Sequence, residues 1–269
     1  MPGIRTERLE DGRLFLQPSQ SWVNTFLNCP ELARREMLGE TPRTETDATA
    51  IGTSVHAAFE AVLNGMSVED GESVALEELE RLMALDNFEW VQIKTQETAI
   101  KTVSRVFWSW ANNVLPELPP VIATEKPFDV LLHEDERMMI RLAGTMDALF
   151  EGRDGPEIKD WKTAGRPWDE HETRWKIQPT IYTYAIAQEY GMDREYEFDF
   201  VVLLKPRDEV QFITTKRDKR HWGFLTDQLI GIGNLIAADL PVWPLRDQHH
   251  LCSGKWCPVY NDCRGSHGL

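Results

Sequence analysis

The chain has 269 residues, of which 42% are hydrophobic and 27% are charged, and its formal net charge at pH 7 is −15. This length and composition are typical of one large globular domain, or of a core with a helical insertion, and they exclude collagen-like and largely disordered chains. The negative charge argues against a protein that coats DNA, because such proteins are normally basic, but it leaves open an enzyme that handles DNA in a local groove.

The N-terminal part of the chain has the patterns of helices. Ser19 and Ser21 are candidate N-caps of a first helix, and Ser67 with Asp70 resembles a capping box. The expected helices are residues 22–28, 31–38, 54–63, 67–85 and 89–114, and the polar residues 40–50 are expected to form a loop. Together they form a helical section over residues 19–118.

Strand patterns begin at residue 121. The dipeptide Asp154–Gly155 predicts a hairpin turn between two of these strands. The expected elements are strands 121–130, 138–150 and 155–161, a helix 172–189, strands 196–204 and 209–215, and a helix 219–237. This order predicts an α/β fold whose core covers residues 119–240. No apolar run approaches the roughly 20 residues of a membrane span, and the N-terminus lacks the pattern of a secretory signal, so we expect a cytoplasmic location and no membrane partner.

Two acidic residues and a lysine form the most informative motif. Asp147 lies in one expected strand and Asp160 with Lys162 in the next, where the period of two puts Asp160 and Lys162 on one face and Trp161 on the other. Two carboxylates brought together can hold Mg²⁺ or Mn²⁺, which prefer oxygen ligands, and the lysine can orient or deprotonate an attacking water. Metal-dependent phosphodiesterases need this layout, although a hairpin with a surface aspartate and a solvated lysine has the same pattern.

Three further polar residues are spaced so that they could join this site. His56 and Glu60 are one helical turn apart, as are Gln178 and Tyr182. His56 could be a ligand of the same metal or a structural residue, and Gln178 with Tyr182 could hold a phosphate or a base or form an ordinary amphipathic edge. Basic residues occur around the motif, namely Lys159, Lys162, Arg166, Arg174 and Lys176.

The four cysteines are distributed unevenly along the chain. Cys29 lies near the N-terminus, whereas Cys252, Cys257 and Cys263 lie within the last eighteen residues. The expected reducing compartment disfavours disulfides, so we expect four thiolates on one metal centre, either structural Zn²⁺ or an iron–sulfur cluster. The C-x4-C-x5-C spacing is long for a zinc ribbon and favours iron, and four unrelated buried thiols are the alternative. Such a centre would join the tail, residues 241–269, to Cys29.

Taken in order, these residues resemble the motifs of a known family. The segments are SWVNTFLNCPELARREMLG with Cys29, GTSVHAAFE with His56, GTMDALF with Asp147, EIKDWKTAG with Asp160 and Lys162, QPTIYTYA with Gln178 and Tyr182, and CSGKWCPVYNDC with the closing cysteines. Over nearly its whole length the chain is similar to the RecB-like branch of the PD-(D/E)XK nucleases, particularly to the iron–sulfur exonucleases of CRISPR adaptation and of phages. The spacing between Cys252 and Cys257 departs from the shorter spacing that members often have.

The resemblance implies a fold and a reaction. The fold would be a single restriction-endonuclease-like domain over residues 1–269, with a mixed central sheet flanked by helices, an N-terminal helical insertion and a C-terminal cysteine-cluster tail. The reaction would be metal-dependent hydrolysis of DNA phosphodiester bonds by an exonuclease, on single-stranded ends, in recombination, replication, repair or CRISPR spacer processing. The implied setting is the cytoplasm of a bacterial or phage-infected cell, with a recombination, replication or CRISPR-adaptation protein as partner.

The resemblance also implies roles for individual residues. The metal ligands would be His56, Asp147, Asp160 and the backbone carbonyl of Trp161, and the catalytic residues would be Asp147, Asp160 and Lys162. An iron–sulfur cluster of the 4Fe–4S type, or Zn²⁺, would be bound by Cys29, Cys252, Cys257 and Cys263. The DNA-binding residues would be Gln178 and Tyr182. We expect Glu125 to support a metal ligand indirectly, and Trp161, Trp168 and Trp175 could stack on unpaired bases or pack in the core. The alternative function is a non-catalytic DNA-binding or assembly subunit that keeps the fold and the cluster, and the intact acidic residues and lysine argue against it.

Overall fold

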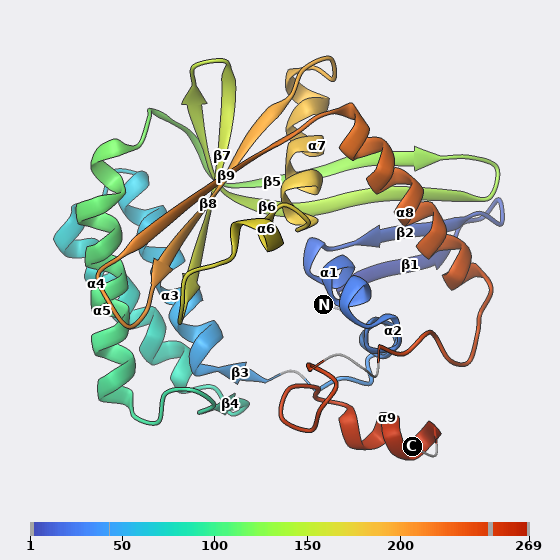
Figure 1. Ribbon diagram of the computed structural model, residues 1–269, viewed down its shortest axis with the longest axis horizontal. Coiled ribbons are helices and arrows are strands. Elements are labelled where there is room, and N and C mark those ends of the chain that lie inside the picture. The colour runs from blue at the N-terminus through green and yellow to red at the C-terminus, as the bar shows by residue number, and fades with distance from the viewer. Residues whose placement is uncertain (1–2, 43, 247–249, 268–269) are drawn as a thin grey trace. The chain divides into compact units, whose positions relative to one another are not determined.

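The strands of this protein form one large mixed sheet and one small sheet. The computed structural model describes residues 3–42, 44–246 and 250–267. Its strands are β1 (Ile4–Arg8), β2 (Leu14–Pro18), β3 (Glu45–Thr46), β4 (Phe88–Glu89), β5 (Val121–Glu134), β6 (Met138–Gly152), β7 (Gly155–Ala164), β8 (Tyr196–Leu204) and β9 (Val210–Arg217). The large sheet has the order β1-β2-β6-β7-β8-β9, with β5 paired to β6, and β3 pairs with β4 in the small one (Figure 1). The pairs β2–β6 and β7–β8 are parallel, and β1–β2, β6–β7 and β8–β9 are antiparallel.

Helices flank this sheet. They are α1 (Gln20–Asn28), α2 (Pro30–Met37), α3 (Asp47–Leu63), α4 (Val68–Met83), α5 (Gln96–Asn113), α6 (Glu170–Thr173), α7 (Gln178–Tyr190), α8 (Lys219–Ala237) and α9 (Tyr260–His267), with a 3-10 turn at Leu115–Glu117. A mixed central sheet flanked by helices confirms the α/β architecture expected from the sequence. Among the described residues, no helix has both the length and the apolar character needed to cross a bilayer.

The chain divides into two compact units. Unit 1 comprises Met1–Pro42, Asp129–Gly144 and Trp222–Leu269, and unit 2 comprises Arg43–Phe128 and Thr145–His221. Strands β5 and β6 each run from one unit into the other, so each unit contains only part of these two strands. The acidic motif therefore belongs to unit 2 and all four cysteines belong to unit 1.

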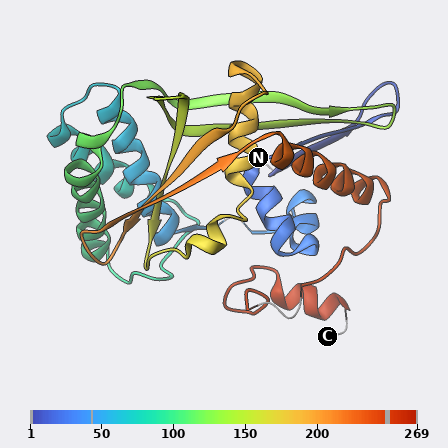
Figure 2. The ribbon, with the colours of Figure 1, turned by 45° about the horizontal axis from the view of Figure 1, so that its top comes forward.

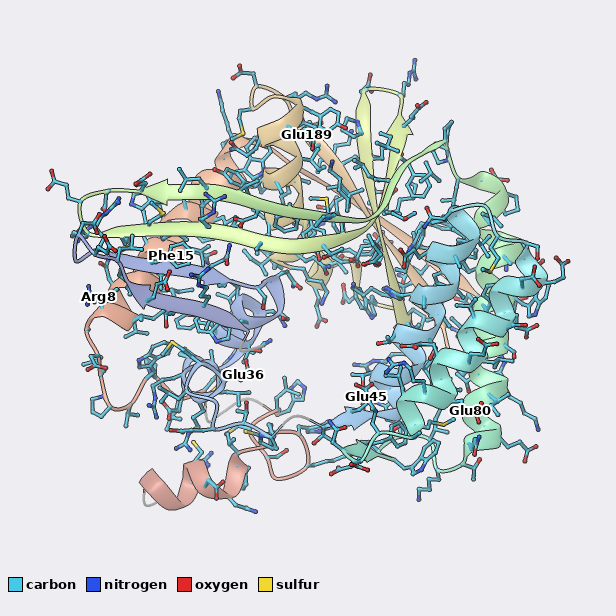
Figure 3. All side chains as sticks on the ribbon, turned by 180° about the vertical axis from the view of Figure 1, so that it is seen from behind. Arg8, Phe15, Glu36, Glu45, Glu80 and Glu189 are labelled. Carbon is cyan, nitrogen blue, oxygen red and sulfur yellow. The ribbon has the colours of Figure 1, made fainter. Side chains whose placement is uncertain are left out.

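The core of unit 2 lies between its N-terminal helices and one face of its strands. Phe59 of α3 stacks on Trp110 of α5, with ring centroids 4.3 Å apart. Trp161 of β7 meets Phe59 at 5.9 Å and Trp110 at 6.0 Å, edge to face in both pairs. Such aromatic pairs bury large apolar areas, and they leave the charged residues of α4, such as Glu80, on its exposed face (Figure 3). This packing holds β7 against α3 and α5.

The other face of the same strands packs on α7. Tyr182 of α7 lies with its ring centroid 6.0 Å from that of Phe198, which in turn lies 4.8 Å from Phe200. Because side chains alternate along a strand, Phe198 and Phe200 of β8 point to α7, whereas Val201 belongs to the core cluster on the opposite side. Residues of β7 that lie opposite Trp161 therefore face α7.

Unit 1 is built from the β1–β2 hairpin, the adjoining parts of β5 and β6, and helices that cover them. The Arg5 guanidinium lies 5.2 Å from the centroid of the Phe15 ring, across the hairpin (Figure 3). Helix α8 runs alongside the strands of this unit (Figure 2). It contacts them closely at Gly233, where a Cβ atom would lie only 2.8 Å from Leu16 and 2.9 Å from Met138. A side chain at that position would require the ends of the Leu16 and Met138 side chains to shift.

A buried carboxylate links the first helices of unit 1 to its C-terminal segment. Glu31, 0% exposed, binds the guanidinium of Arg34 at 2.8 Å and that of Arg35 at 3.0 Å. Its Oε2 also accepts a 2.9 Å hydrogen bond from the backbone N–H of Trp243, which is 212 residues away in the sequence. These hydrogen bonds compensate the cost of burying the charge, and they hold α2 against the segment that follows α8.

Several element boundaries differ from those expected. The residues expected to form a loop at 40–50 include the first turn of α3, which begins at Asp47 after the N-cap Thr46. The single helix expected at 172–189 consists of α6 and α7, separated by a short connection. Strands β1 and β2 were not expected at all. The early start of α3 and the presence of β2 depend on tertiary contacts, because the Asp47 carboxylate binds backbone N–H groups of residues 91–93 and β2 pairs with the distant strand β6.

Candidate active site

Two carboxylates and a lysine meet on β6 and β7 of unit 2. Asp147 Oδ2 accepts a 2.8 Å hydrogen bond from the backbone N–H of Trp161, which ties the first acidic residue to the strand of the second. Asp160 is completely buried, and its Oδ2 forms an ion pair with Lys162. Trp161 points into the helical core while Asp160 and Lys162 face α7, as the period of two predicts.

His56 of α3 and Glu125 of β5 lie beside Asp147. His56 Nδ1 is 3.5 Å from Asp147 Oδ2, and one ligand atom from each of His56, Glu125 and Asp147 lies within 4.8 Å of the other two. The His56 ring also forms a hydrogen bond with the backbone of Trp161. An imidazole and two carboxylates at these distances fit a divalent cation, and a set dominated by oxygen atoms suits Mg²⁺ or Mn²⁺.

Glu125 has an unusual backbone conformation. Its φ angle is 42°, in the left-handed region that residues other than glycine rarely occupy. Strain of this kind is often found at functional positions, and here it occurs within a strand at the residue that faces His56 and Asp147. The sequence suggested only an indirect role for Glu125, because a glutamate in a strand has no pattern that distinguishes a ligand from a solvent-exposed side chain.

Burial and the crowding of charges change the pKa of each group in the site. Burial raises the pKa of Asp160 to about 6, although the Lys162 ammonium acts in the opposite direction. Burial also raises the pKa of Asp147 and, with the negative charge of Asp147, it raises the pKa of Glu125 to about 7. Burial and the charge of Lys162 lower the pKa of His56 to about 4, so its imidazole is neutral at pH 7 and has a lone pair free for a cation.

The site has more negative than positive charge. Lys162 is largely desolvated, yet the nearby carboxylates of Asp160 and Asp147 raise its pKa and keep its ammonium charged. One ammonium cannot neutralise the three carboxylates of Asp147, Asp160 and Glu125, and burial raises the pKa of each of them. A divalent cation would supply the missing positive charge, so the residues present fit a metal site.

Gln178 and Tyr182 both lie next to the acidic residues, on α7. Gln178 donates from Nε2 to Asp160 Oδ1 over 2.6 Å. Tyr182 is 7% exposed, and its ring packs edge to face on Phe128, with centroids 5.6 Å apart. Burial raises the pKa of the Tyr182 hydroxyl, which therefore stays protonated at neutral pH. Gln178 thus contacts the site directly, Tyr182 belongs mainly to the core beside it, and the expected contact of this pair with DNA remains a prediction.

A second acidic group in unit 2 is paired with a lysine side chain. Ligand atoms of Glu157, Glu197 and Asp199 lie within 4.8 Å of one another. The Lys159 ammonium is 2.6 Å from Asp199 Oδ2 and 3.5 Å from Glu157 Oε2. This group is therefore a buried ion-pair network of the sheet, and we assign it no metal.

The cysteines of unit 1 lie near one another. Cys29 is at the junction of α1 and α2, and with Cys252 and Cys257 it lines a mainly apolar pocket of about 220 Å³. Burial and the negative charge of the Cys252 and Cys29 thiolates raise the pKa of Cys257, and burial with the charges of Glu31, Cys257 and Cys29 raises the pKa of Cys263. In the described ranges, no three cysteine sulfurs approach within 4.8 Å of one another.

The comparisons with known proteins agree with the geometry of unit 2. A family model described as the PD-(D/E)XK nuclease superfamily matches residues 17–264. The chain belongs to the PD-(D/E)XK nuclease superfamily. No curated protein matches the chain.

Solved structures are similar to this PD-(D/E)XK chain, and the first of the following two shows its fold. The crystal structure of a candidate exonuclease from Eubacterium rectale has a TM-score of 0.55 and 12% sequence identity, and the match covers 87% of this chain and 86% of that one. The crystal structure of SSO0001 matches 90% of this chain and 96% of that one, with a TM-score of 0.37 and 13% identity. The superfamily expected from the sequence is confirmed. PD-(D/E)XK nucleases hydrolyse nucleic acid with divalent metal ions, and the group of His56, Glu125 and Asp147 fits this requirement.

Proposed function

We propose that this PD-(D/E)XK protein is a Mg²⁺- or Mn²⁺-dependent exonuclease that removes nucleotides from single-stranded DNA ends. One observation carries the proposal: His56, Asp147, Asp160 and Lys162, which come from three different elements, have their functional groups at one place in unit 2. Action on ends rests on the order of motifs shared with the RecB-like exonucleases, and the Eubacterium rectale structure described as a candidate exonuclease supports it.

The residues of the site divide the chemistry between them. His56, Glu125, Asp147, Asp160 and the backbone carbonyl of Trp161 would hold the metal. When bound, the ion polarises the scissile phosphate and lowers the pKa of a water molecule. The Lys162 ammonium, which the acidic residues keep protonated, positions that water and stabilises negative charge that develops on the phosphate.

We further propose that Cys29, Cys252, Cys257 and Cys263 hold an iron–sulfur cluster of the 4Fe–4S type, with Zn²⁺ as the alternative. The shared pocket of three of these cysteines and their mutual effect on pKa support a common centre. Thiolates are ligands for both metals. The spectrum of anaerobically purified protein distinguishes them, since thiolate-bound iron clusters are brown and Zn²⁺ is colourless.

The proposed setting is DNA end processing in recombination, replication, repair or CRISPR spacer capture, in a bacterial or phage-infected cell. A partner protein of one of these processes would deliver the DNA end. Unit 1, with the cysteine centre, is the natural candidate for such a contact because the proposed chemistry does not use it.

The test is cleavage of single-stranded DNA labelled at either end, with Mn²⁺, by the wild type and by Asp160→Asn. We expect metal-dependent shortening by the wild type and its loss in the variant, because a metal ligand is removed. Glu157→Gln is the matched control, since it removes a carboxylate charge from the same strand outside the site. No shortening of either strand by folded, metal-loaded wild type would refute the nuclease proposal and favour the non-catalytic alternative.

A further inference from the structure

A polar groove of about 710 Å³ begins where the catalytic strand of unit 2 ends. Thr163 and Ala164, which directly follow Lys162 on β7, line its start, and Lys176 and Lys205 line its sides. We propose that this groove holds the single strand of nucleic acid next to the scissile phosphate, with Lys176 and Lys205 on its phosphates and Trp175 stacked on one of its bases. This inference rests on the proposed function and adds the residues that would bind the substrate.

The two lysines are half-buried without an acidic partner. Lys176 Nζ lies 4.5 Å from the centroid of the Trp168 ring, and Lys205 Nζ lies 3.3 Å from the Gln92 side-chain oxygen. Throughout the described part of the chain, no carboxylate oxygen comes within 4.0 Å of either ammonium. Removing an ammonium from water with no carboxylate in direct contact is unfavourable, and a bound anion would offset that cost at both positions.

The charges around the groove favour a phosphate-bearing ligand. Arg166, Lys176 and Lys205 outnumber the two acidic residues of the lining, Asp169 and Glu172, although the whole chain has a net charge of −15. Asp169 is engaged as the N-cap of α6, where its side chain accepts from the backbone N–H of the helix. Glu172 opposes part of the charge of Lys176. The groove is thus locally basic on an acidic protein, which is the pattern expected of a nucleic-acid contact.

The groove lies close enough to the metal site for charged groups of the site to act on a lysine of the groove. The charges of Lys162 and Asp160 both act on the Lys176 ammonium. Lys176 lies in the connection between α6 and α7, and Gln178, two residues later, binds Asp160 directly. A nucleotide whose phosphate contacts Lys176 would therefore be a near neighbour of the one at the metal site.

One exposed tryptophan, the sequence neighbour of the groove residue Lys176, is available for stacking. Trp175 is 85% exposed. Of the other two tryptophans that could stack, Trp161 is buried in the helical core, and Trp168 is covered by Lys176 and meets Phe200 at 5.4 Å. An exposed indole of this size is unfavourable in water, and base stacking on an aromatic ring would cover it.

A buried arginine holds Trp175 in place. Arg217, 4% exposed, donates from Nη2 to the backbone carbonyl of Arg174 over 2.8 Å and from Nε to the Thr180 hydroxyl over 3.0 Å. The backbone N–H of Trp175 donates to the Glu172 carbonyl over 3.3 Å. Arg217 is therefore a positioning residue, because it fixes the carbonyl that precedes Trp175 without reaching the groove itself. A backbone that is already fixed loses less entropy on binding than a mobile one.

The loop across the groove is held rigid as well. The Gln211 side chain accepts from the Trp168 backbone N–H over 2.8 Å and donates to the Trp168 carbonyl over 3.0 Å. These two hydrogen bonds fix the residues between β7 and α6. The groove walls are thus preorganised on both sides of Lys176.

The test measures binding rather than cleavage. Fluorescence anisotropy of a 5′-labelled oligothymidylate, in EDTA so that no hydrolysis occurs, gives the affinity as a function of salt concentration. The double variant Lys176→Gln with Lys205→Gln is expected to reduce the slope of log affinity against log salt by about 1.4, since each phosphate contact on a single strand contributes about 0.7. The matched control, Lys101→Gln with Lys219→Gln, removes two exposed lysines that do not line the groove, and it should leave the slope unchanged.

The proposed stacking of a base on Trp175 is tested by a separate measurement. Trp175→Ala should weaken oligothymidylate binding by about 5- to 150-fold at an unchanged salt slope, the range expected for one stacked base. It should affect a blunt duplex of the same length less, because paired bases are not free to stack. Circular dichroism and thermal melting establish that each variant is folded.

The outcomes separate this inference from the proposed function. Folded variants that bind with wild-type affinity and slope, while the wild type cleaves DNA, would overturn the groove assignment alone. Variants that lose binding as expected, with a wild type that never cleaves, would retain the groove and refute the nuclease. A wild type that does not bind the oligonucleotide would overturn the groove assignment too.

Discussion

Gln178 of α7 and Asp160 of β7 are joined by a 2.6 Å hydrogen bond between the amide Nε2 and the carboxylate Oδ1. Asp160 has no exposed surface, and its second oxygen is paired with Lys162. The orientation of the carboxylate is therefore set by one residue on each side. A helix that packs on the sheet thus positions a candidate metal ligand of the sheet.

Replacing Gln178 by alanine should weaken metal binding and cleavage. The residue supports Asp160 without being a ligand itself, and loss of such support typically costs about 10- to 100-fold in metal affinity or activity. Isothermal titration with Mn²⁺ measures the affinity directly, beside the rate of DNA cleavage. Gln188→Ala, at an exposed position of the same helix, is the control, and equal Mn²⁺ affinity in both variants would show that Gln178 does not orient Asp160.

Metal affinity should increase with pH up to about pH 7. The cation must displace a proton from Asp160, whose pKa is about 6 in the metal-free protein, so the ionised fraction rises about tenfold between pH 5 and 7. Glu125, with a pKa of about 7, acts in the same direction. His56, with a pKa of about 4, is already neutral over this range and does not limit binding.

Mn²⁺ titrations between pH 5 and 8 measure this dependence, and repeating them in two buffers of different ionisation enthalpy counts the protons released. Asp160→Asn should bind more weakly and with a flatter pH profile. An affinity of the wild type that is constant over the range would mean that these carboxyl groups are not protonated in the metal-free site.

Replacing Cys257 by alanine should bleach the protein and lower its melting temperature. Cys257 lines the same pocket as Cys29 and Cys252, and a bound centre contributes its binding free energy to folding. For a chain of this size, each kcal/mol lost lowers the melting temperature by about 2–4 °C. Visible absorption and calorimetry of anaerobically purified protein are the measurements.

Cys29→Ala should have the same effect on the spectrum, although it is more than 220 residues away in the sequence. The two variants control each other, because only a shared centre makes both lose the same chromophore. A brown wild type whose colour survives either substitution would exclude that cysteine as a ligand.

Replacing Asp47 by alanine should destabilise the helical part of unit 2. The Asp47 carboxylate accepts hydrogen bonds of 2.7–3.2 Å from the backbone N–H groups of Val91, Gln92 and Ile93. Removing a buried charged acceptor leaves these donors unpaired, and we expect the free energy of unfolding to fall by about 2–4 kcal/mol. Urea denaturation measures the change, with the exposed Asp86→Ala as control.

The same contact has a defined pH dependence. Although burial acts in the opposite direction, the three backbone N–H groups lower the pKa of Asp47. Its contribution is therefore fully present above the unfolded pKa of about 3.9 and is lost as the pH falls through the lower folded value. A wild type and an Asp47→Ala variant of equal stability at pH 7 would contradict the assigned role.

Local patterns predicted the regular elements well where the pattern was self-contained. Helix 219–237 and strand 196–204 have the bounds that the sequence indicates, because their apolar periodicity and flanking turns lie within the elements. The start of α3 was expected seven residues too late, since its first turn is anchored through Asp47 to a loop more than forty residues away. Long-range anchors of this kind have no local signal.

The residues of the candidate site also divide into those that local patterns predict and those that depend on long-range contacts. Asp147, Asp160 and Lys162 could be proposed from their spacing and from the resemblance, because strand alternation decides which of them share a face. Glu125 could not, because its role depends on a left-handed backbone angle within β5 and on its proximity to His56. Gln178 could be proposed as a member of the site, but the structure alone shows that it binds Asp160.

The sequence by itself determined the fold class, the superfamily and the identity of the main acidic motif, because these follow from periodicity and from the order of short motifs along one chain. The tertiary structure alone decided which distant groups meet: Glu125 with Asp147, Gln178 with Asp160, and Lys176 with the groove that follows β7. The physical reason is that periodicity constrains only the direction of side chains within an element. Distances between elements depend on how the helices and strands pack.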